Sequence, residues 1–272
     1  MIEAKAIVQE VQGRPVLGGL SCSFQKGRMY GIIGPNGVGK STLLQLLSGI
    51  DRPKHGEVLL DGRIILSYPR KQLARIMAVL QQSGLPPVGF SVREVVSMGR
   101  YPYQNWLGSE EKDSDAVIDA ALKAMGLKEL EHRKMDHLSG GERQRVALAK
   151  LMAQEPSVIL LDEPTTYLDI GFQVQLLDTV RAWQRERDLT VIAVLHDLNL
   201  ASLYCDELVV LHRGTVAAAG EPHIVLTTAL IEQVYETAAS VISHPLTGSP
   251  QIMLQPYSYK GMNQVMKVKE RQ

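Results

Sequence analysis

Unbroken apolar runs mark the first predicted strands of this chain. Residues 158–161 and 191–195 are wholly apolar, and a helical pattern over residues 170–187 separates them. Buried parallel strands joined by a crossover helix produce this arrangement, because both faces of such strands are covered. The pattern therefore predicts an α/β core.

Glycines divide the other strand-like segments. A predicted strand over residues 28–33 leads into a glycine-rich loop, 34–40, and then into an apolar-faced helix that ends at Gly49. Two further pairs of short apolar runs flank Asp61-Gly62 and residues 212–214. Asp-Gly suits the positive φ angles of a tight turn, so both pairs are predicted hairpins.

The middle of the chain has a different pattern. A Gly-Leu-Pro-Pro sequence interrupts the chain at residues 84–87, and the residues from 92 to 155 are helical in pattern and charged, without a convincing strand. We interpret residues 85–155 as a helical subdomain. It would be inserted into an α/β core made of residues 1–84 and 156–243.

Prolines and charges characterise the end of the chain. Residues 244–272 contain Pro245, Pro250 and Pro256, and they close with basic side chains around Glu270. We expect an irregular, solvated tail rather than a lipid-binding segment.

Composition narrows the possible functions. The 272 residues contain 29 Lys+Arg and 29 Asp+Glu, which gives a formal net charge of zero. Nucleic-acid binding needs an excess of basic residues, so we expect no nucleic-acid partner. Every apolar run is far shorter than the ~20 residues of a membrane-spanning helix, so we do not expect the chain itself to cross a bilayer. The two cysteines form no Cys-x-x-Cys pair, and a reducing cytoplasm fits them best.

The glycine-rich loop matches the phosphate-binding pattern Gly-x-x-x-x-Gly-Lys-Ser, with the strand before it and the helix after it that this pattern requires. Glycines let backbone N–H groups point at phosphates, and the helix start adds its positive end. Lys40 would reach the β- and γ-phosphates of ATP, and the Ser41 hydroxyl would bind Mg²⁺. The predicted nucleotide-binding residues of this phosphate loop are Gly34, Pro35, Asn36, Gly37, Val38, Gly39, Lys40, Ser41 and Thr42.

Two carboxylates, Asp162 and Glu163, directly follow the apolar run 158–161. This position puts them at the carboxyl end of a parallel strand, where such sheets bind ligands. Asp162 is suited to holding Mg²⁺ through water, and Glu163 to polarising an attacking water. Together with a phosphate loop, the pair indicates nucleotide hydrolysis.

A phosphate loop alone leaves kinases, GTPases, helicases and motors open. The octet Leu-Ser-Gly-Gly-Glu-Arg-Gln-Arg at residues 138–145 resembles the signature motif of ATP-binding cassette (ABC) proteins, and the resemblance extends over approximately residues 5–240. It implies an ABC-type P-loop NTPase of the α/β class, with an inserted helical subdomain and an antiparallel β subdomain. It also implies that two chains enclose two ATP molecules. Ser139, Gly140 and Gly141 of one chain would then hold the γ-phosphate bound by the other.

The resemblance implies further site residues. Gln82 would contact Mg²⁺ and sense a permease, with its neighbour Gln81 as the alternative. Asp169 would communicate across the dimer, and His196 would contact the γ-phosphate. One position departs from the family pattern: Val11 stands where an aromatic residue usually stacks on adenine.

A finer resemblance concerns the kind of ABC protein. Residues 90–103 are similar to a stretch of the ATPases that power import of ferric siderophores, haem and cobalamin. Residues 165–170, with Tyr167, and residues 195–199 are close to the ferric-siderophore branch, whereas residues 171–173 depart from it. The resemblance implies an ATP-hydrolysing subunit of such an importer.

That function implies several partners. They are integral membrane permease subunits, an extracytoplasmic substrate-binding protein that acts indirectly, and a second copy of the ATPase. The chain would lie peripherally at the cytoplasmic face of the membrane. Two alternatives stay open: a haem or cobalamin importer, and a soluble ABC ATPase of iron–sulfur cluster assembly. ABC proteins of DNA repair or translation fit poorly, because the chain has one cassette and no long heptad run.

Overall fold

A six-stranded sheet forms the centre of the computed structural model, which describes residues 1–81, 89–105, 114–166 and 168–256. Its strand order is β10-β9-β3-β8-β7-β6, and all neighbours are parallel except the β9–β10 hairpin at one edge. The strands are β3 (Met29–Ile33), β6 (Met77–Leu80), β7 (Val158–Asp162), β8 (Thr190–Val194), β9 (Glu207–His212) and β10 (Thr215–Gly220). The predicted α/β core is confirmed.

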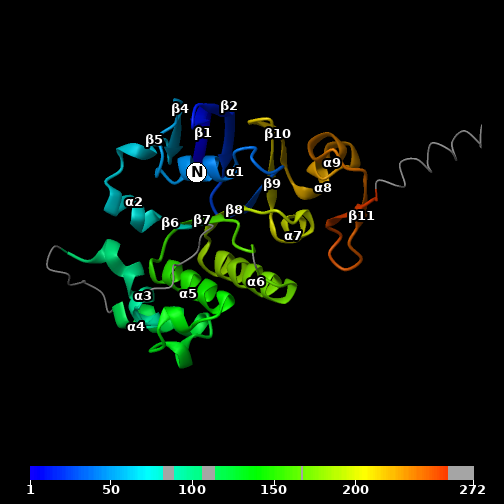
Figure 1. Ribbon diagram of the computed structural model, residues 1–272. Helices are drawn as coiled ribbons and strands as arrows, with labels where there is room; N and C mark the ends of the chain where they lie inside the picture. Colours follow the sequence, from blue (N-terminus) through cyan, green and yellow to red (C-terminus); the bar gives the residue numbers. More distant parts are fainter. Residues whose placement is uncertain (82–88, 106–113, 167, 257–272) are drawn as a thin grey trace, which may run out of the picture.

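A four-stranded antiparallel sheet, in the order β2-β1-β4-β5, lies above the central sheet in Figure 1. Its strands are β1 (Ile2–Val11), β2 (Arg14–Phe24), β4 (His55–Leu60) and β5 (Arg63–Ile64). The hairpin predicted around Asp61-Gly62 is β4–β5. The pattern did not identify β1 and β2, because shifts in their pairing register interrupt the alternation of inward and outward side chains.

The helices of the described residues cover both faces of the central sheet (Figure 1). They are α1 (Lys40–Leu47), α2 (Arg70–Ile76), α3 (Val92–Ser97), α4 (Ser114–Ala124), α5 (Gly140–Ala153), α6 (Ile170–Arg187), α7 (Leu198–Tyr204), α8 (Pro222–Val225) and α9 (Thr228–Tyr235). Helix α6 confirms the crossover helix predicted over residues 170–187. None of the helices in the described ranges is long and apolar enough to span a membrane.

Two hydrophobic clusters divide the core, and the central strands contribute to both. In β8, Val191 and Ala193 pack with helices α3 to α7, whereas Ile192 and Val194 pack with α1 and the antiparallel sheet. Successive side chains of a strand point to opposite faces, so an unbroken apolar run is what a doubly covered strand needs. This burial fixes the sheet edge on which the site is built.

Helices dominate the described part of residues 85–155. Helices α3, α4 and α5 lie together below the central sheet in Figure 1, joined by short 3₁₀ turns that include η2 (Met98–Tyr103). The only strand-like feature recorded among these described residues is a single bridge between Ser91 and Lys134. The described elements thus match the helical pattern.

The prediction of an irregular tail over residues 244–272 is wrong for the first part of that segment. Strands β11 (Ala239–Ser243) and β12 (Pro250–Leu254) form an antiparallel hairpin. Asn199 of α7 holds β12, because its Oδ1 accepts a hydrogen bond from the Ile252 N–H at 2.7 Å. Pro250 stands at the first position of the strand, where proline is tolerated. Residues 257–272 lie outside the described part.

Candidate functional site

Three neighbouring parallel strands, β3, β8 and β7, end at the same edge of the central sheet. Val194 of β8 pairs with Ile32 of β3 on one side and with Asp162 of β7 on the other. The phosphate loop follows β3, Glu163 follows β7, and His196 lies just beyond β8. Strand order therefore brings together groups that are far apart in the sequence.

Glycines shape the phosphate loop. Gly34, Gly37 and Gly39 have φ angles of 149°, 76° and 101°, a region that side chains disfavour. A Cβ at Gly34 would lie 2.3 Å from the carbonyl oxygen of Leu211. Gly39 begins α1 without a side-chain cap, so the N–H groups of the first turn are available to an anion.

Lys40 lies folded over the loop. Its ammonium group donates hydrogen bonds to the carbonyl oxygens of Gly34 (2.8 Å) and Pro35 (2.9 Å). Burial lowers the pKa of Lys40, and the nearby carboxylates of Glu163 and Asp162 oppose that change. A polyphosphate would supply the negative charge that a buried ammonium group favours.

Ser41 and Asp162 are hydrogen-bonded to each other. The Ser41 hydroxyl donates to Asp162 Oδ1 at 2.8 Å. Burial raises the pKa of Asp162, while the bond from Ser41 lowers it. A hydroxyl and a carboxylate fit Mg²⁺, which binds through a few protein oxygens together with phosphates and waters. The described residues contain no cluster of three or more His, Cys, Asp or Glu that could hold a metal alone.

Glu163 and His196 contact each other directly. His196 Nε2 lies 2.6 Å from Glu163 Oε1, and the Thr166 hydroxyl donates to Glu163 Oε2 at 3.2 Å. Glu163 has a φ of 51°, which is unusual for a residue with a side chain. Backbone strain of this kind clusters at functional sites.

These groups border one open cleft of about 450 Å³. The phosphate loop, Glu163 and His196 line it, together with Val11 and Val16. Val11 is 44% exposed. The described lining contains no Phe, Tyr or Trp, in line with the departure that the sequence shows at Val11.

The residues of the ABC-type signature lie elsewhere. Ser139 caps α5, where its hydroxyl accepts from the Glu142 N–H and Glu142 accepts from the Ser139 N–H in return. Asp169 caps α6 by accepting from the Phe172 N–H at 3.0 Å. Neither these caps nor Gly140 and Gly141 belong to the described lining of the cleft. The structure does not bring them to the phosphate loop of their own chain.

Two residues named from the sequence, Gln82 and Tyr167, lie outside the described residues. The alternative Gln81 is described, and it lines a cavity of about 280 Å³ that Ser41 and Asp162 also line. Gln81 is therefore near the predicted magnesium ligands.

The sequence pattern missed several supporting residues. Val16 lines the cleft from β2, which was not predicted as a strand. Gln144 donates to the Pro164 carbonyl oxygen at 3.0 Å, linking α5 to the segment after Glu163. Tyr235 of α9 lines a cavity that Pro35 and Asn36 of the phosphate loop also line. No short sequence motif predicts such contacts, because each one joins segments that are far apart in the sequence.

A strand, a glycine-rich phosphate loop and a helix, with an Asp-Glu pair beside them on the same sheet edge, define a P-loop nucleotide-binding site. Comparison with known proteins narrows this class. The family described as ABC transporter matches residues 17–166. The chain belongs to the ABC transporter family, as an ATP-binding ATPase subunit.

Two relatives illustrate the similarity. The ferric enterobactin transport ATP-binding protein of Escherichia coli (strain K12) is 41% identical over 234 residues, which cover 86% of each chain. The petrobactin import ATP-binding protein of Bacillus anthracis is 38% identical over 249 residues, which cover 92% of this chain and 91% of the relative.

Two solved structures are also similar to this chain. A chain described as part of a metal-chelate type ABC transporter in an inward-facing conformation has a TM-score of 0.80 and 26% identity, covering 96% of this chain and 98% of its own length. A dimeric bacterial ABC transporter cassette has a TM-score of 0.71 and 26% identity, covering 81% of this chain and 98% of its own. These likenesses support the ABC ATPase fold, a permease partner and dimerisation.

Proposed function

We propose that this chain hydrolyses ATP to energise import of an iron–siderophore complex through a partner membrane permease. The nucleotide chemistry rests on one observation: the Ser41–Asp162 and Glu163–His196 pairs meet at the sheet edge that carries the phosphate loop. The substrate class rests on the relatives that transport ferric enterobactin and petrobactin.

The phosphate loop would bind the β- and γ-phosphates through its backbone N–H groups and the start of α1. Lys40 would exchange its two loop carbonyls for phosphate oxygens. Ser41 and Asp162 would hold Mg²⁺ together with the phosphates, with Gln82 as a further ligand. When bound, Mg²⁺ neutralises charge on the phosphates and orients them.

Glu163 would act on the attacking water. Its carboxylate is held in place by Thr166 and His196, and a fixed base close to the water raises the rate of proton transfer. His196 would donate from Nε2 to the γ-phosphate once ATP occupies the cleft. His196 would thus help to orient Glu163 before ATP binds and would contact the phosphate afterwards.

A second copy of the chain would complete each site. Ser139, Gly140, Gly141 and Asp169 lie at helix starts outside the cleft, so their natural target is the nucleotide of a facing subunit. ATP would favour the closed pair, because only that state satisfies both sets of donors. Hydrolysis would then reopen it.

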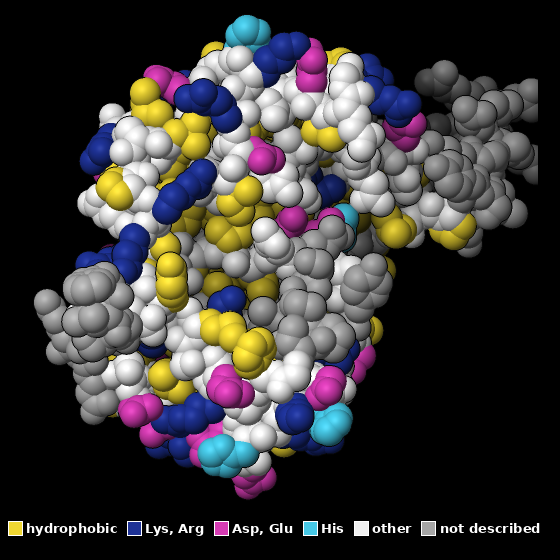
Figure 2. All heavy atoms as spheres, turned by 60° about the vertical axis from the view of Figure 1, so that its left-hand side comes forward, with side chains coloured by type: hydrophobic (Ala, Val, Ile, Leu, Met, Phe, Trp, Pro, Cys, Tyr) yellow, Lys and Arg dark blue, Asp and Glu magenta, His cyan; other side chains and the backbone are white. Residues whose placement is uncertain are grey.

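The permease would contact the hollow between the sheets and the helical part. Figure 2 shows hydrophobic side chains gathered along this hollow. Phe90 and Tyr101 of the helical part are 49% and 70% exposed, and Lys71 lies over the Tyr101 ring. Exposed hydrophobic groups of this kind commonly mark a protein interface. Such docking would hold the chain peripherally at the cytoplasmic face of the membrane.

Three segments would divide this work. Residues 1–84 and 156–243 would bind the nucleotide, and residues 85–155 would carry the signature motif and the permease surface. An extracytoplasmic binding protein would deliver the substrate to the permease.

Co-purification from detergent-solubilised membranes, with this chain as bait, tests the proposal. We expect a stoichiometric polytopic permease, and ATPase activity that rises when a binding protein loaded with ferric siderophore is added. Stimulation by haem or cobalamin instead would replace the substrate. A soluble assembly partner without a permease would overturn the transport function and favour iron–sulfur cluster assembly.

A further inference from the structure

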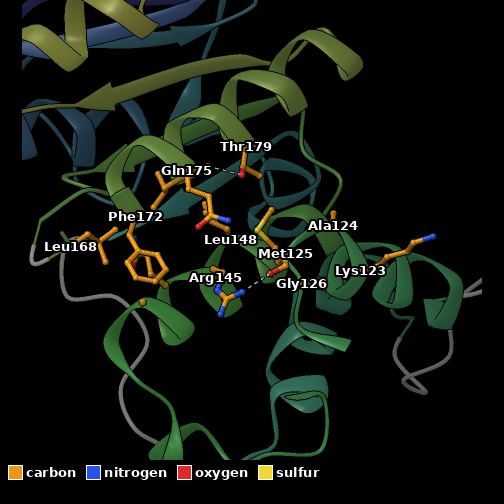
Figure 3. A pocket seen from close by; sticks show the side chains of 13 residues that line it. Lys123, Ala124, Met125, Gly126, Arg145, Leu148, Leu168, Phe172, Gln175 and Thr179 are labelled. Atoms are coloured by element: carbon orange, nitrogen blue, oxygen red, sulfur yellow. Dashed lines mark hydrogen bonds between the residues drawn. The ribbon is translucent and has the colours of Figure 1, made fainter. Parts of the chain in front are cut away.

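A second cavity, of about 260 Å³, lies between the helical part and helix α6, and it shares no residue with the nucleotide cleft. Figure 3 shows side chains of α6, among them Phe172, Gln175 and Thr179, facing Met125 and Arg145 across this space. The volume corresponds to about nine water molecules at ~30 Å³ each. It therefore suits a ligand of about the same number of non-hydrogen atoms.

The lining combines an apolar wall with positive charge. Leu148, Leu168 and Phe172 contribute hydrocarbon surface, and Lys123 and Arg145 contribute cations. No carboxylate belongs to the described lining. A mostly apolar pocket with a few polar groups is typical of small-molecule sites, and its charge favours an anion.

Arg145 is incompletely paired. Its Nη1 donates to the Met125 carbonyl oxygen at a long 3.3 Å, and its buried Nε has no hydrogen-bond partner among the described residues. The neighbouring carboxylate of Glu142 is engaged by the Ser139 N–H at 2.7 Å. Buried donors without partners are rare and unfavourable, so the contacts within the described residues leave this guanidinium group only partly satisfied.

We propose that the cavity binds a small monocarboxylate with an apolar body, held by a hydrogen-bonded ion pair to Arg145. A carboxylate can accept two parallel bonds from a guanidinium group, which a neutral ligand of the same shape cannot match. The apolar part would lie against Leu148 and Phe172.

A ligand bound in the cavity would act on the ATPase through helices α5 and α6, which line its two sides. Gly141 and Gln144 of α5 line one side of the cavity and Phe172 of α6 lines the other. Gln144 also contacts the carbonyl oxygen of Pro164, next to Glu163. A bound carboxylate would therefore alter the rate of hydrolysis. This regulatory step rests on the proposed function, whereas binding itself does not.

Isothermal titration calorimetry of the full chain without nucleotide tests the binding, with benzoate as the probe and benzamide as its neutral counterpart. We expect benzoate to bind at least about tenfold more tightly, as the loss of a charged hydrogen bond implies. Arg145→Met should weaken benzoate binding by a similar factor. Arg185→Met, which removes an exposed α6 cation outside this cavity, should leave it unchanged.

A second variant guards against misfolding of Arg145→Met. Ala124 is exposed and lines the cavity, so Ala124→Phe should fill the space without disturbing the core and should abolish benzoate binding. Equal affinity for benzoate and benzamide, or benzoate binding that survives both variants, would overturn the proposal. If benzoate binds as expected but no permease co-purifies, the cavity assignment stands and the transport function fails.

Discussion

Replacing the carboxylate of Glu163 by an amide separates its chemistry from its packing. The two contacts of Glu163 use different carboxylate oxygens, at 2.6 Å from His196 and 3.2 Å from the Thr166 hydroxyl. In Glu163→Gln the side-chain carbonyl can still accept from His196, and the new NH₂ group can donate to the Thr166 hydroxyl oxygen. The fold should therefore be retained. Only the base is lost, and general-base catalysis contributes about 10²–10⁴-fold, or about 3–6 kcal/mol in the barrier at ~1.4 kcal/mol per tenfold change.

ATP affinity should stay the same or rise in this variant, because the cleft loses a negative charge beside a polyanion. Fluorescent-nucleotide titration measures the binding, single-turnover phosphate release measures hydrolysis, and size-exclusion chromatography detects an ATP-bound dimer, which should accumulate. The matched control is Glu221→Gln, which changes an exposed Glu–His pair outside the cleft and should hydrolyse ATP normally. Undiminished hydrolysis by Glu163→Gln would refute the role of Glu163 as the base.

Three further perturbations address the loop and the fold. Lys40→Ala should weaken ATP binding by about tenfold or more, since charged hydrogen bonds contribute ~1.5–3 kcal/mol each; near-normal affinity by nucleotide titration would contradict the phosphate-loop assignment. Gly34→Ala should lower the free energy of unfolding by about 2–4 kcal/mol in urea titrations, because the new Cβ would lie 2.3 Å from the Leu211 carbonyl oxygen; unchanged stability would show that the loop can adjust. Burial raises the pKa of Asp206, whereas hydrogen bonds from Arg181 and the Met29 backbone lower it. The hydrogen bonds outweigh the burial, so the pKa of Asp206 lies below its usual value. Asp206→Asn should therefore cost about 2–3 kcal/mol at pH 7. This difference should begin to decrease as the pH falls below the usual carboxyl pKa of ~4 and should vanish only below the lowered pKa of Asp206 in the folded protein; a difference that persists at still lower pH would contradict the pairing.

The central strands were predictable because burial on both faces leaves a strong local pattern. Strands β7 and β8 and helix α6 match the predicted positions closely. Strands β1 and β2 left no such pattern, since Ala6 has a φ of 49° and the pairing register shifts beside it. Two of the prolines that suggested an irregular tail belong to the hairpin instead: Pro245 lies in the connection between β11 and β12, and Pro250 is the first residue of β12.

The candidate site, like the fold, was predictable from the sequence only in part. Lys40 and Ser41 belong to a contiguous motif, so the sequence alone could name them and propose their chemistry. Contacts such as His196 with Glu163 arise because β7 and β8 are neighbours, and the sequence does not state strand order. Val16 was missed because its strand was missed.

Uptake into proteoliposomes tests the central claim most directly. The co-purified permease and this ATPase would be reconstituted with ATP on the side of the ATPase and binding protein loaded with ferric siderophore on the other. The account predicts that iron crosses only when ATP is hydrolysed, and that Glu163→Gln abolishes uptake while Glu221→Gln preserves it. Iron uptake that continues without ATP, or ATP hydrolysis that moves no ferric siderophore, would contradict the account.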